Sequence, residues 1–597
     1  MSFTDPLPLL VGELTPFLAR LDAGEEFKPV LEDLLLQLPV ERAEHLSLIM
    51  REGRGSWLPL LRGSAGEALF VGNSFSATAH VAAALGFRPH LYDVCEERMR
   101  FEDYRSRALT GVPCAHTLST NAKRLPFADK RFALVVQEAG VPLVKGGLGH
   151  NLSELRRVCS GELVVTVNNR LGYKRSLERR GRFAVPSAAR FLREILRSKG
   201  GERTLRGYRR ALQFSGCAAP EAFSLYPHSA DFTHVVALDK PAPRLHIGPK
   251  ERKNKLKMAG NKLGLFPWLT PSFALVSTEL SLAQSLESRI ERVLTELSEI
   301  SGERRGEMDE WVATRGNCVV LQTRPASGDM DDPEGRWCLH IALSPHKAEQ
   351  VALHDQTIRS LWEKGQPVPV PEPIYSGVLQ GISLACERRL PGLTAPQRSG
   401  NETAMRRLLD DTVELFPKLL TGKVITIDER AFAKYFDWRF DIVADHAGRE
   451  GTRLALEELR ARTRERLLGE AMPLSLQHAD LRNKHVQIDP DGRILGFLDW
   501  GSSRKADVPY FDLLQLIVHE TKQARGGRIE GAWRQLLTPG ASRAWERDAL
   551  QRYAQKIGIS PNFCEAIEQA FPVFVAAMAE SNWDFSRPRW VHRGFGI

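Results

Sequence analysis

The chain has 597 residues, 43% of them hydrophobic and 26% charged, with a formal net charge of +9. This length predicts two to four domains at about 100–200 residues each, and the composition is that of a globular protein. The eight cysteines show no Cys-x-x-Cys spacing, which argues against a zinc finger or a disulfide framework. With no signal peptide and no apolar stretch of membrane-spanning length, we expect a cytosolic protein without a membrane span.

The first half alternates strand-like and helix-like segments. Residues 1–60 carry leucines at helical spacing and predict an N-terminal helical cap. Strands are then predicted at 68–71, 89–92, 132–136, 161–167 and 272–276, with a helix at 77–85. Alternating strands and helices imply an α/β domain with a parallel sheet covered on both faces. This domain is predicted over 61–280, its last 40 residues or so being an appendage.

The second half predicts a different architecture, over 281–597. Helices are predicted at 283–300 and 347–363, strands at 318–321 and 336–343, and further helices from 400 to 470. The proline-rich segment 367–373 breaks the regular structure. A few strands followed by many helices favour an α+β fold for this half.

A first candidate site lies between the strand at 68–71 and the helix after it. Gly72 and Asn73 occupy this turn, and Asp93 follows the second strand. In an open α/β sheet such turns meet at the carboxyl edge, where ligands bind. A glycine lets a ligand approach the backbone closely, and a later carboxylate can accept hydrogen bonds from ribose hydroxyls.

This arrangement resembles the class I S-adenosylmethionine-dependent methyltransferases, whose fold is Rossmann-like. The stretch from Asn121 to Asp129 is similar to the segment of that family whose first position contacts adenine, and 152–158 is similar to a later helix. The resemblance implies that Gly72, Asn73, Asp93 and Asn121 bind S-adenosylmethionine. The loop has one glycine where the family has two or three, so a scaffold that has lost the cofactor is the alternative.

A second candidate site lies near the end of the chain. His478-Ala479-Asp480 begins a loop, the turn Asp489-Pro490-Asp491-Gly492 predicts a hairpin, and Asp499 follows its second strand. The hairpin should bring Asp480 and Asp499 to the same end. Phosphoryl transfer needs such a pair, because one carboxylate takes the proton of the acceptor hydroxyl and the other binds Mg²⁺.

This second stretch resembles the aminoglycoside phosphotransferase and choline kinase group, a protein-kinase-like fold that uses ATP and Mg²⁺. The resemblance implies that Asp480 is the catalytic aspartate, that His478 supports its loop and that Asp512 braces it. Asp499 is implied as a metal ligand. The remaining candidates are His485 and Asn483 as further metal ligands, and Cys386 and Glu387 beside the adenine.

Two positions depart from that family. His485 stands where the family has a metal-binding asparagine, and imidazole is a poorer ligand for Mg²⁺ than an amide oxygen. The strand at 336–343 lacks the lysine that pairs with the nucleotide phosphates. His340 or Arg324 are candidates to replace it, and Asp355 is a candidate for the helix acid that pairs with that lysine.

Together the two sites predict a bifunctional transferase, with an S-adenosylmethionine-dependent methyltransferase half and an ATP-dependent kinase half. The kinase half would act on a hydroxyl of a small molecule, a sugar or a glycan. A degenerate two-domain scaffold or regulatory protein is the first alternative. The net positive charge leaves a nucleic-acid methyltransferase as a second alternative. The sequence shows no interleaved aromatic and basic module that would support nucleic-acid binding.

Overall fold

We describe the protein from a computed structural model. It describes residues 12–39, 42–43, 46, 49–63, 65–72, 74–119, 123–138, 147–172, 202–229, 231–239, 264–278, 287–314, 318–329, 332–394, 401–445, 447, 450–525, 529–538 and 540–578. Two predicted cofactor contacts, Asn73 and Asn121, lie outside these residues. The predicted boundary between the two halves, at 280/281, lies outside them as well.

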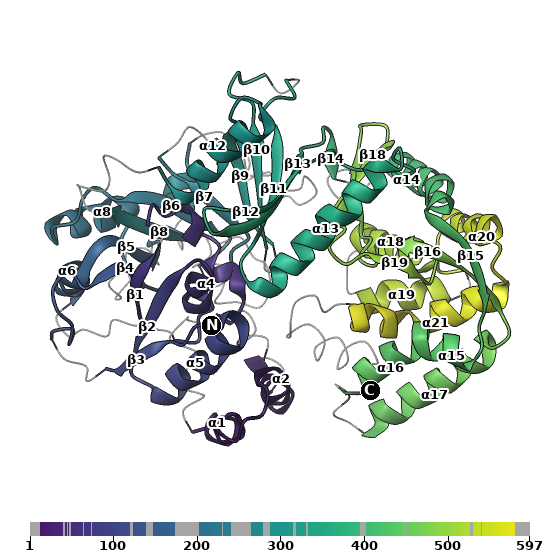
Figure 1. Cartoon of the computed structure of the whole chain (residues 1–597), viewed down its shortest axis with the longest axis horizontal. Helices are drawn as coiled ribbons and strands as arrows, with labels where there is room; N and C mark the ends of the chain where they lie inside the picture. Colours follow the sequence, from purple (N-terminus) through teal and green to yellow (C-terminus); the bar gives the residue numbers. More distant parts are fainter. Residues whose placement is uncertain are drawn as a thin grey trace, which may run out of the picture.

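One sheet of thirteen strands runs through both halves (Figure 1). Its order is β12-β13-β11-β10-β9-β7-β6-β8-β5-β4-β1-β2-β3. These strands are β1 Gly66–Val71, β2 Phe87–Asp93, β3 Ala115–Leu118, β4 Phe132–Gln137, β5 Cys159–Asn168, β6 Glu221–Tyr226, β7 His234–Ala237, β8 Ser272–Thr278, β9 Glu307–Ala313, β10 Cys318–Arg324, β11 Trp337–Ala342, β12 Pro373–Leu379 and β13 Ile382–Arg388. The halves join where His234 of β7 pairs with Val312 of β9.

The first half is a doubly wound α/β sheet. Strands β3, β2, β1, β4 and β5 are parallel neighbours in that order, which is the order of Rossmann-like sheets. Strand β8 runs antiparallel between β5 and β6. The helices of this half are α4 Thr78–Ala84, α5 Glu96–Thr110, α6 Gly147–Val158, α8 Leu205–Phe214 and α10 Phe266–Leu269. The predicted parallel arrangement is thus present in β1 to β5, while β6, β7 and β8 are antiparallel and make the sheet a mixed one.

The five strands β9 to β13 form an antiparallel sheet with a helix on each face. Helix α13 (Pro345–Glu363) packs Val351 against Ala342 and Ala385 on one face. Helix α12 (Arg289–Ser301) packs Val293 and Leu297 into the core on the other face. That second core continues into the first half, so the two halves share buried side chains as well as a sheet.

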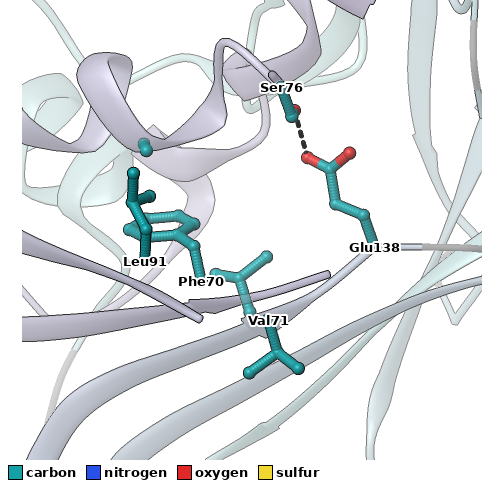
Figure 2. A pocket seen from close by; sticks show the side chains of 7 residues that line it. Phe70, Val71, Ser76, Leu91 and Glu138 are labelled. Carbon is teal, nitrogen blue, oxygen red and sulfur yellow. Dashed lines mark hydrogen bonds between the residues drawn. The ribbon is translucent and has the colours of Figure 1, made fainter. Parts of the chain in front are cut away.

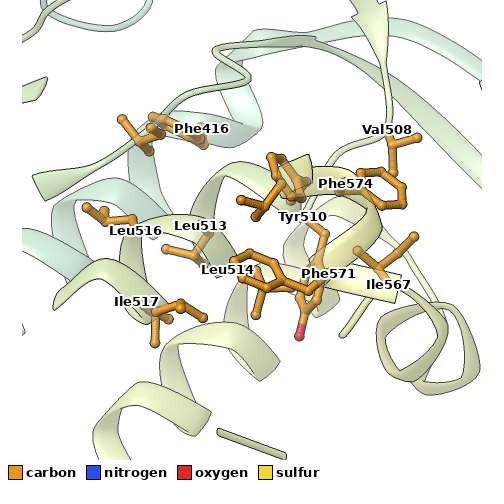
Figure 3. Packing of buried hydrophobic residues seen from close by; sticks show 14 of the residues in the cluster. Phe416, Val508, Tyr510, Leu513, Leu514, Leu516, Ile517, Ile567, Phe571 and Phe574 are labelled. Atoms are coloured by element: carbon orange, nitrogen blue, oxygen red, sulfur yellow. The ribbon is translucent and has the colours of Figure 1, made fainter. Parts of the chain in front are cut away.

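The end of the chain forms a mainly helical lobe around two small sheets. Its helices are α14 Glu402–Leu415, η6 Phe416–Leu419, α15 Glu429–Phe432, η7 Ala433–Asp437, α16 Trp438–Ala444, α17 Glu450–Leu467, η8 Asn483–His485, α18 Phe511–Arg525, α19 Ile529–Leu537, α20 Ala544–Ile557 and α21 Pro561–Met578. Its strands are β14 Leu393–Thr394, β15 Leu420–Thr426, β16 Ala471–Gln477, β17 Val486–Ile488, β18 Ile494–Phe497 and β19 Arg504–Asp507. Figure 3 shows its core, where Leu513 and Leu514 of α18 pack near Phe571 of α21.

One prediction for this lobe is wrong. The stretch from 400 to 470 was expected to be helical throughout, but Leu420–Thr426 forms β15 and pairs with β16. The segment Leu-Thr-Gly-Lys-Val-Ile-Thr contains four β-branched residues, which lose side-chain freedom in a helix and suit a strand.

The N-terminal segment packs on the first half. Helices α1 (Thr15–Asp22) and α2 (Phe27–Gln37) bury their apolar faces against Phe75 and Phe101. The short helices η2 (Glu52–Gly55) and η3 (Leu58–Leu60) follow them. Gly55 lies so close to α4 that a Cβ atom there would be 2.7 Å from the Val81 side chain. Among the residues described, no helix is both long and apolar enough to cross a membrane.

Candidate functional site

The loop after β16 and the loop after β18 meet at one place. Ligand atoms of Asp480, His485 and Asp499 all lie within 4.8 Å of one another. Asp480 follows β16, and β17 pairs with β18 to form the hairpin that returns the chain to Asp499. The predicted convergence of the two carboxylates is therefore present in the structure.

Hydrogen bonds to the Asp512 carboxylate fix the loop that follows β16. The Asp512 carboxylate accepts the backbone N–H groups of His478 at 2.7 Å and Ala479 at 2.8 Å. Burial raises the pKa of Asp512 to about 6, although these donors oppose the rise. The position of Asp512 at the start of α18 therefore matches the bracing role that the sequence predicted.

His478 supports the loop from inside. It is fully buried, and its ring packs against Trp500 at a tilt of 40°, with 4.6 Å between centroids. Its Nε2–H can donate to the Leu498 carbonyl at 2.9 Å, which ties the Asp480 loop to the Asp499 loop. This placement suits a structural role, because the side chain has no open path to a substrate.

Both loops contain a residue in the left-handed backbone region. Ala479 has a φ of 67° and Asp499 a φ of 64°. A residue with a Cβ atom pays about 1–2 kcal/mol for this conformation. Such strain persists only where the surrounding structure imposes it, and it occurs often at functional sites.

His485 is placed as an acceptor facing Asp499. Its Nδ1–H donates to the Asp480 carbonyl oxygen at 2.7 Å, and its Nε2 lies 3.1 Å from Asp499 Oδ2. Burial, with the nearby charge of Lys484, lowers the pKa of His485 well below its usual range. The imidazole is then neutral with its lone pair at Nε2, and this buried atom has no hydrogen-bond partner among the described residues.

The carboxylates beside His485 carry negative charge. Desolvation raises the pKa of Asp499, but opposing charge interactions, that with Lys484 among them, outweigh this effect and hold the net pKa below its usual range. Asp480 forms an ion pair with Arg482. Two carboxylates and an imidazole lone pair thus face one another, and a cation between them would relieve their repulsion. This arrangement fits a divalent metal ion.

Asn483 is not part of this group. Its side-chain amide donates to Glu520 of α18 at 3.3 Å, and both residues are buried. The structure therefore brings together three of the four residues of the predicted Asp480–Asp499 site and directs Asn483 away from it.

The strand that would carry the phosphate-binding lysine is β11. Here His340 takes the position facing α13, and its Nε2 lies 3.2 Å from Oε1 of Glu387 on β13. The other carboxylate oxygen of Glu387 lies 3.0 Å from Nε2 of His354 on α13. A cluster of two histidines and one glutamate thus joins β11, β13 and α13.

The other residues considered for this region lie elsewhere. Arg324 pairs with Glu307 at 2.7 Å on the surface, and Asp355 pairs with Arg359 at 2.8 Å. The Cys386 side chain lies in the core on the far face of the sheet from α13. Sequence reasoning missed His354, because it searched α13 for an acid and not for a second histidine.

The first candidate site is closed by its own side chains. Asp93 is fully buried and accepts hydrogen bonds from the hydroxyl and the backbone N–H of Ser74, and from Arg98 at 2.5 Å. The backbone N–H of Val94 binds it too, at 2.6 Å. Both oxygens of the carboxylate are therefore engaged. As placed, Asp93 does not offer a free acceptor to ribose hydroxyls.

Beside Gly72, which has a φ of 113°, lies a small hollow (Figure 2). Phe70, Val71 and Leu91 line its apolar side, and Ser76 and Glu138 its polar side. Its volume is about 10 Å³, room for roughly one water molecule. Glu138 accepts from Ser76 at 2.5 Å and forms a buried ion pair with Arg54.

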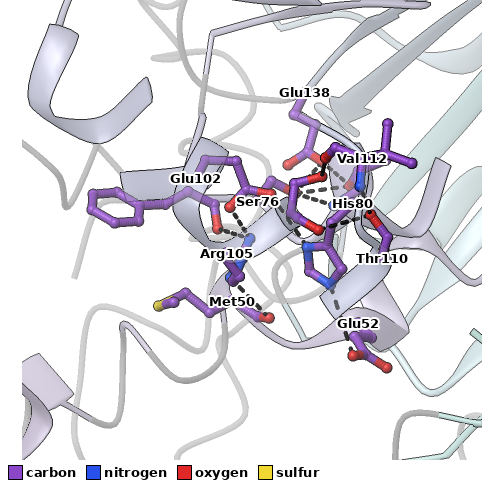
Figure 4. Close-up of polar contacts among 12 residues, drawn as sticks. Met50, Glu52, Ser76, His80, Glu102, Arg105, Thr110, Val112 and Glu138 are labelled. Atoms are coloured by element: carbon purple, nitrogen blue, oxygen red, sulfur yellow. Dashed lines mark hydrogen bonds and ion pairs between the residues drawn. The ribbon is translucent and has the colours of Figure 1, made fainter. Parts of the chain in front are cut away.

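A buried polar group that the sequence did not reveal joins the N-terminal segment to this half (Figure 4). His80 of α4 lies 3.2 Å from Glu102 of α5 and 3.8 Å from Glu52 of η2. Arg105 pairs with Glu102 at 2.5 Å and donates to the Met50 carbonyl at 3.3 Å. No motif marks these residues, because each of them alone reads as an ordinary helix-surface charge.

A comparison with protein families decides the nature of the second half. Residues 330–553 match the model of the phosphotransferase enzyme family, APH. This part of the chain, less than half of its length, is similar to that family. The match confirms the predicted aminoglycoside-phosphotransferase-like fold and the prediction that the chain is an enzyme. No curated protein matches the chain.

Solved structures similar to the chain fall into two groups. Aminoglycoside phosphotransferase APH(3'')-Id from Streptomyces rimosus is 19% identical over 48% of this chain and 98% of its own, with a TM-score of 0.30. Geranyl diphosphate C-methyltransferase from Streptomyces coelicolor is 14% identical over 38% of this chain and 80% of its own, with a TM-score of 0.25. Likeness at this level assigns no fold, which rests on the family match and the strand order.

Proposed function

We propose that the phosphotransferase domain moves the γ-phosphoryl group of ATP to a hydroxyl of a small molecule, with a sugar or glycan as the expected class of acceptor. The observation that carries this proposal is the meeting of Asp480, Asp499 and the neutral His485 within 4.8 Å. The family match over 330–553 supports the reaction type.

Each residue has a role that follows from its placement. The half-buried Asp480 would orient the acceptor hydroxyl and take its proton. Asp499 and the Nε2 atom of His485 would hold a divalent ion. Asp512 keeps the loop of Asp480 in place through two backbone hydrogen bonds. A bound Mg²⁺ ion supplies neutralisation of charge on the phosphates.

The ion pair of Arg482 with Asp480 bears on this role. Arg482 is the second residue after Asp480, and its guanidinium binds the carboxylate directly. Arg482 occupies one carboxylate oxygen, so an acceptor hydroxyl would approach the other one.

For the first half we propose a scaffold role in place of methyl transfer. The observation that favours it is the capture of Asp93 by Ser74 and Arg98, which leaves no free carboxylate for a ribose. S-adenosylmethionine should then leave the melting temperature unchanged. A rise of several degrees at millimolar S-adenosylmethionine would contradict this proposal, since a ligand that binds the native state stabilises it.

The phosphotransferase proposal is tested with a panel of acceptors. The full chain is incubated with Mg·ATP and amino sugars, neutral sugars, nucleosides or choline, and ADP release and phosphorylated products are measured. We expect one class to raise ADP release and to gain the mass of one phosphoryl group. ADP release that no acceptor changes, with no phosphorylated product, would contradict the proposal.

A further inference from the structure

The side of β11 and β13 that faces α13 carries a second group of metal-ligating atoms. Cys338 and His340 are two residues apart on β11, so their side chains lie on the same face of the sheet. Glu387 is the register partner of Cys338 on β13. Ligand atoms of these three residues all lie within 4.8 Å of one another.

We propose that Cys338, His340 and Glu387 bind a zinc ion or a similar borderline transition metal. The thiol, imidazole and carboxylate are the three ligand types that zinc takes from proteins. None of them belongs to the Asp480–Asp499 site. The set excludes Mg²⁺ as the natural occupant, because that ion prefers oxygen ligands.

The spacing of the ligand atoms suits a tetrahedral ion. Nε2 of His340 lies 3.2 Å from Oε1 of Glu387 and 3.9 Å from Sγ of Cys338. Zinc bonds of about 2.0–2.3 Å at tetrahedral angles place neighbouring ligand atoms about 3.3–3.6 Å apart. Both distances from Nε2 of His340 are therefore within a few tenths of an ångström of the spacing that zinc requires.

The hydrogen bonds of His354 show that it orients the site and does not ligate the ion. Its Nδ1 accepts the backbone N–H of Trp500 at 3.0 Å, so a neutral ring carries its proton on Nε2. That Nε2–H donates to Oε2 of Glu387 at 3.0 Å. A carboxylate held by a neighbouring donor in this way is the usual support of a metal ligand. Three protein ligands remain, which leaves the fourth position of the ion open, as in catalytic zinc sites.

The charges of the ligand set suit a divalent ion. Cysteine and histidine bind a metal as the thiolate and the neutral imidazole. A divalent ion bound by one thiolate, one carboxylate and one neutral imidazole is neutral overall.

The place of this site suggests its use, and this step rests on the proposed function. The cluster stands on the strand that lacks the phosphate-binding lysine, and His354 links it to Trp500, next to Asp499. A metal ion with an open position there would supply the positive charge that the lysine supplies elsewhere, and could bind a phosphate oxygen of the nucleotide.

Cobalt titration of the metal-stripped full chain tests the site. Excess Mg²⁺ is kept present so that the Asp480–Asp499 site is filled. We expect one Co²⁺ per chain with a thiolate-to-cobalt charge-transfer band, lost in Cys338→Ala. The matched control is Cys386→Ala, which removes a buried thiol from the opposite face of β13 and should keep the band.

A second measurement needs no variant and covers the case in which Cys338→Ala fails to fold. X-ray absorption of the zinc-loaded chain should show one sulfur and otherwise nitrogen or oxygen neighbours. Absence of the cobalt band in the wild-type chain, its persistence in Cys338→Ala, or a zinc shell without sulfur would each overturn the proposal. None of these readouts needs ATP, so a chain without kinase activity could still pass them, and an active kinase could fail them.

Discussion

Asp93 is the last residue of β2 in the first half and Asp499 follows β18 in the second, yet the two differ in their surroundings. Asp93 is fully buried, and Ser74 and Arg98 satisfy it from within the chain. The Asp499 side chain is 51% exposed and faces the lone pair of a neutral imidazole. Two acceptors that face each other, as Asp499 and His485 do, can bind a cation. A carboxylate whose hydrogen bonds are satisfied within the chain, as that of Asp93 is, has a structural role.

The largest expected effect is that of replacing Asp480, the proposed proton acceptor. Asp480→Asn keeps the shape of the side chain but cannot take a proton, so kcat for phosphoryl transfer should fall about 10²–10⁴-fold. The control Asp491→Asn changes an exposed carboxylate in the β17–β18 turn and should leave kcat as it was. Equal turnover by Asp480→Asn and wild type would remove Asp480 from the catalytic role.

Removal of a buried ion pair in the first half should instead lower the free energy of unfolding. Arg54→Ala leaves the buried Glu138 carboxylate without its cation, which should lower the free energy of unfolding by about 3–5 kcal/mol. The control Arg464→Ala removes one member of the exposed pair with Glu429 and should change little. Urea unfolding measures both, and equal losses in the two variants would mean that Arg54 does not stabilise the fold.

Asp512, which accepts the backbone hydrogen bonds of the Asp480 loop, should make the stability of the fold depend on pH. Because the pKa of Asp512 is raised to about 6 in the fold, its ionisation opposes folding. The stability it contributes is complete below its unfolded pKa and is lost as pH rises through 6, a change of about 3 kcal/mol. Asp512→Asn cannot ionise, so its unfolding free energy should lack this decline between pH 4 and 7. A decline of the same size in both proteins would contradict the shifted pKa.

The smallest effect concerns the strained backbone of the open site. Ala479→Gly relieves the left-handed conformation and should raise the unfolding free energy by at most about 1 kcal/mol. The control Ala566→Gly, in the interior of α21, should lower it by about 1 kcal/mol. Thermal melting compares the two, and a clear loss of stability in Ala479→Gly would show that the loop is not strained there.

The sequence predicted the open site better than the closed one. The Asp-Pro-Asp-Gly segment at 489–492 strongly favours a hairpin turn. The meeting of Asp480 and Asp499 could therefore be predicted from residues that are near in the chain. The partners of Asp93 were also near, at Ser74 and Arg98, but several serines and arginines lie nearby and spacing does not say which of them bind the carboxylate.

Contacts between distant segments could not be predicted. The sheet becomes continuous through the pairing of His234 with Val312, and one register pair leaves no pattern in either strand. The link from His354 to Glu387 depends on how α13 lies on β13, which is set by the packing of Val351 against Ala385. The sequence predicted the helix at 347–363 and the strand at 336–343, but not which face each of them presents to the other.

The measurement that tests the account most directly is the binding of Mn²⁺ with ATP, followed by electron paramagnetic resonance of the ion. Mn²⁺ accepts the same oxygen ligands as Mg²⁺. If Asp499 holds the catalytic ion, wild type and Asp491→Asn should bind Mn·ATP alike and Asp499→Asn should lose most of this binding. Unchanged binding of Mn·ATP by Asp499→Asn would contradict the account of the phosphotransferase site.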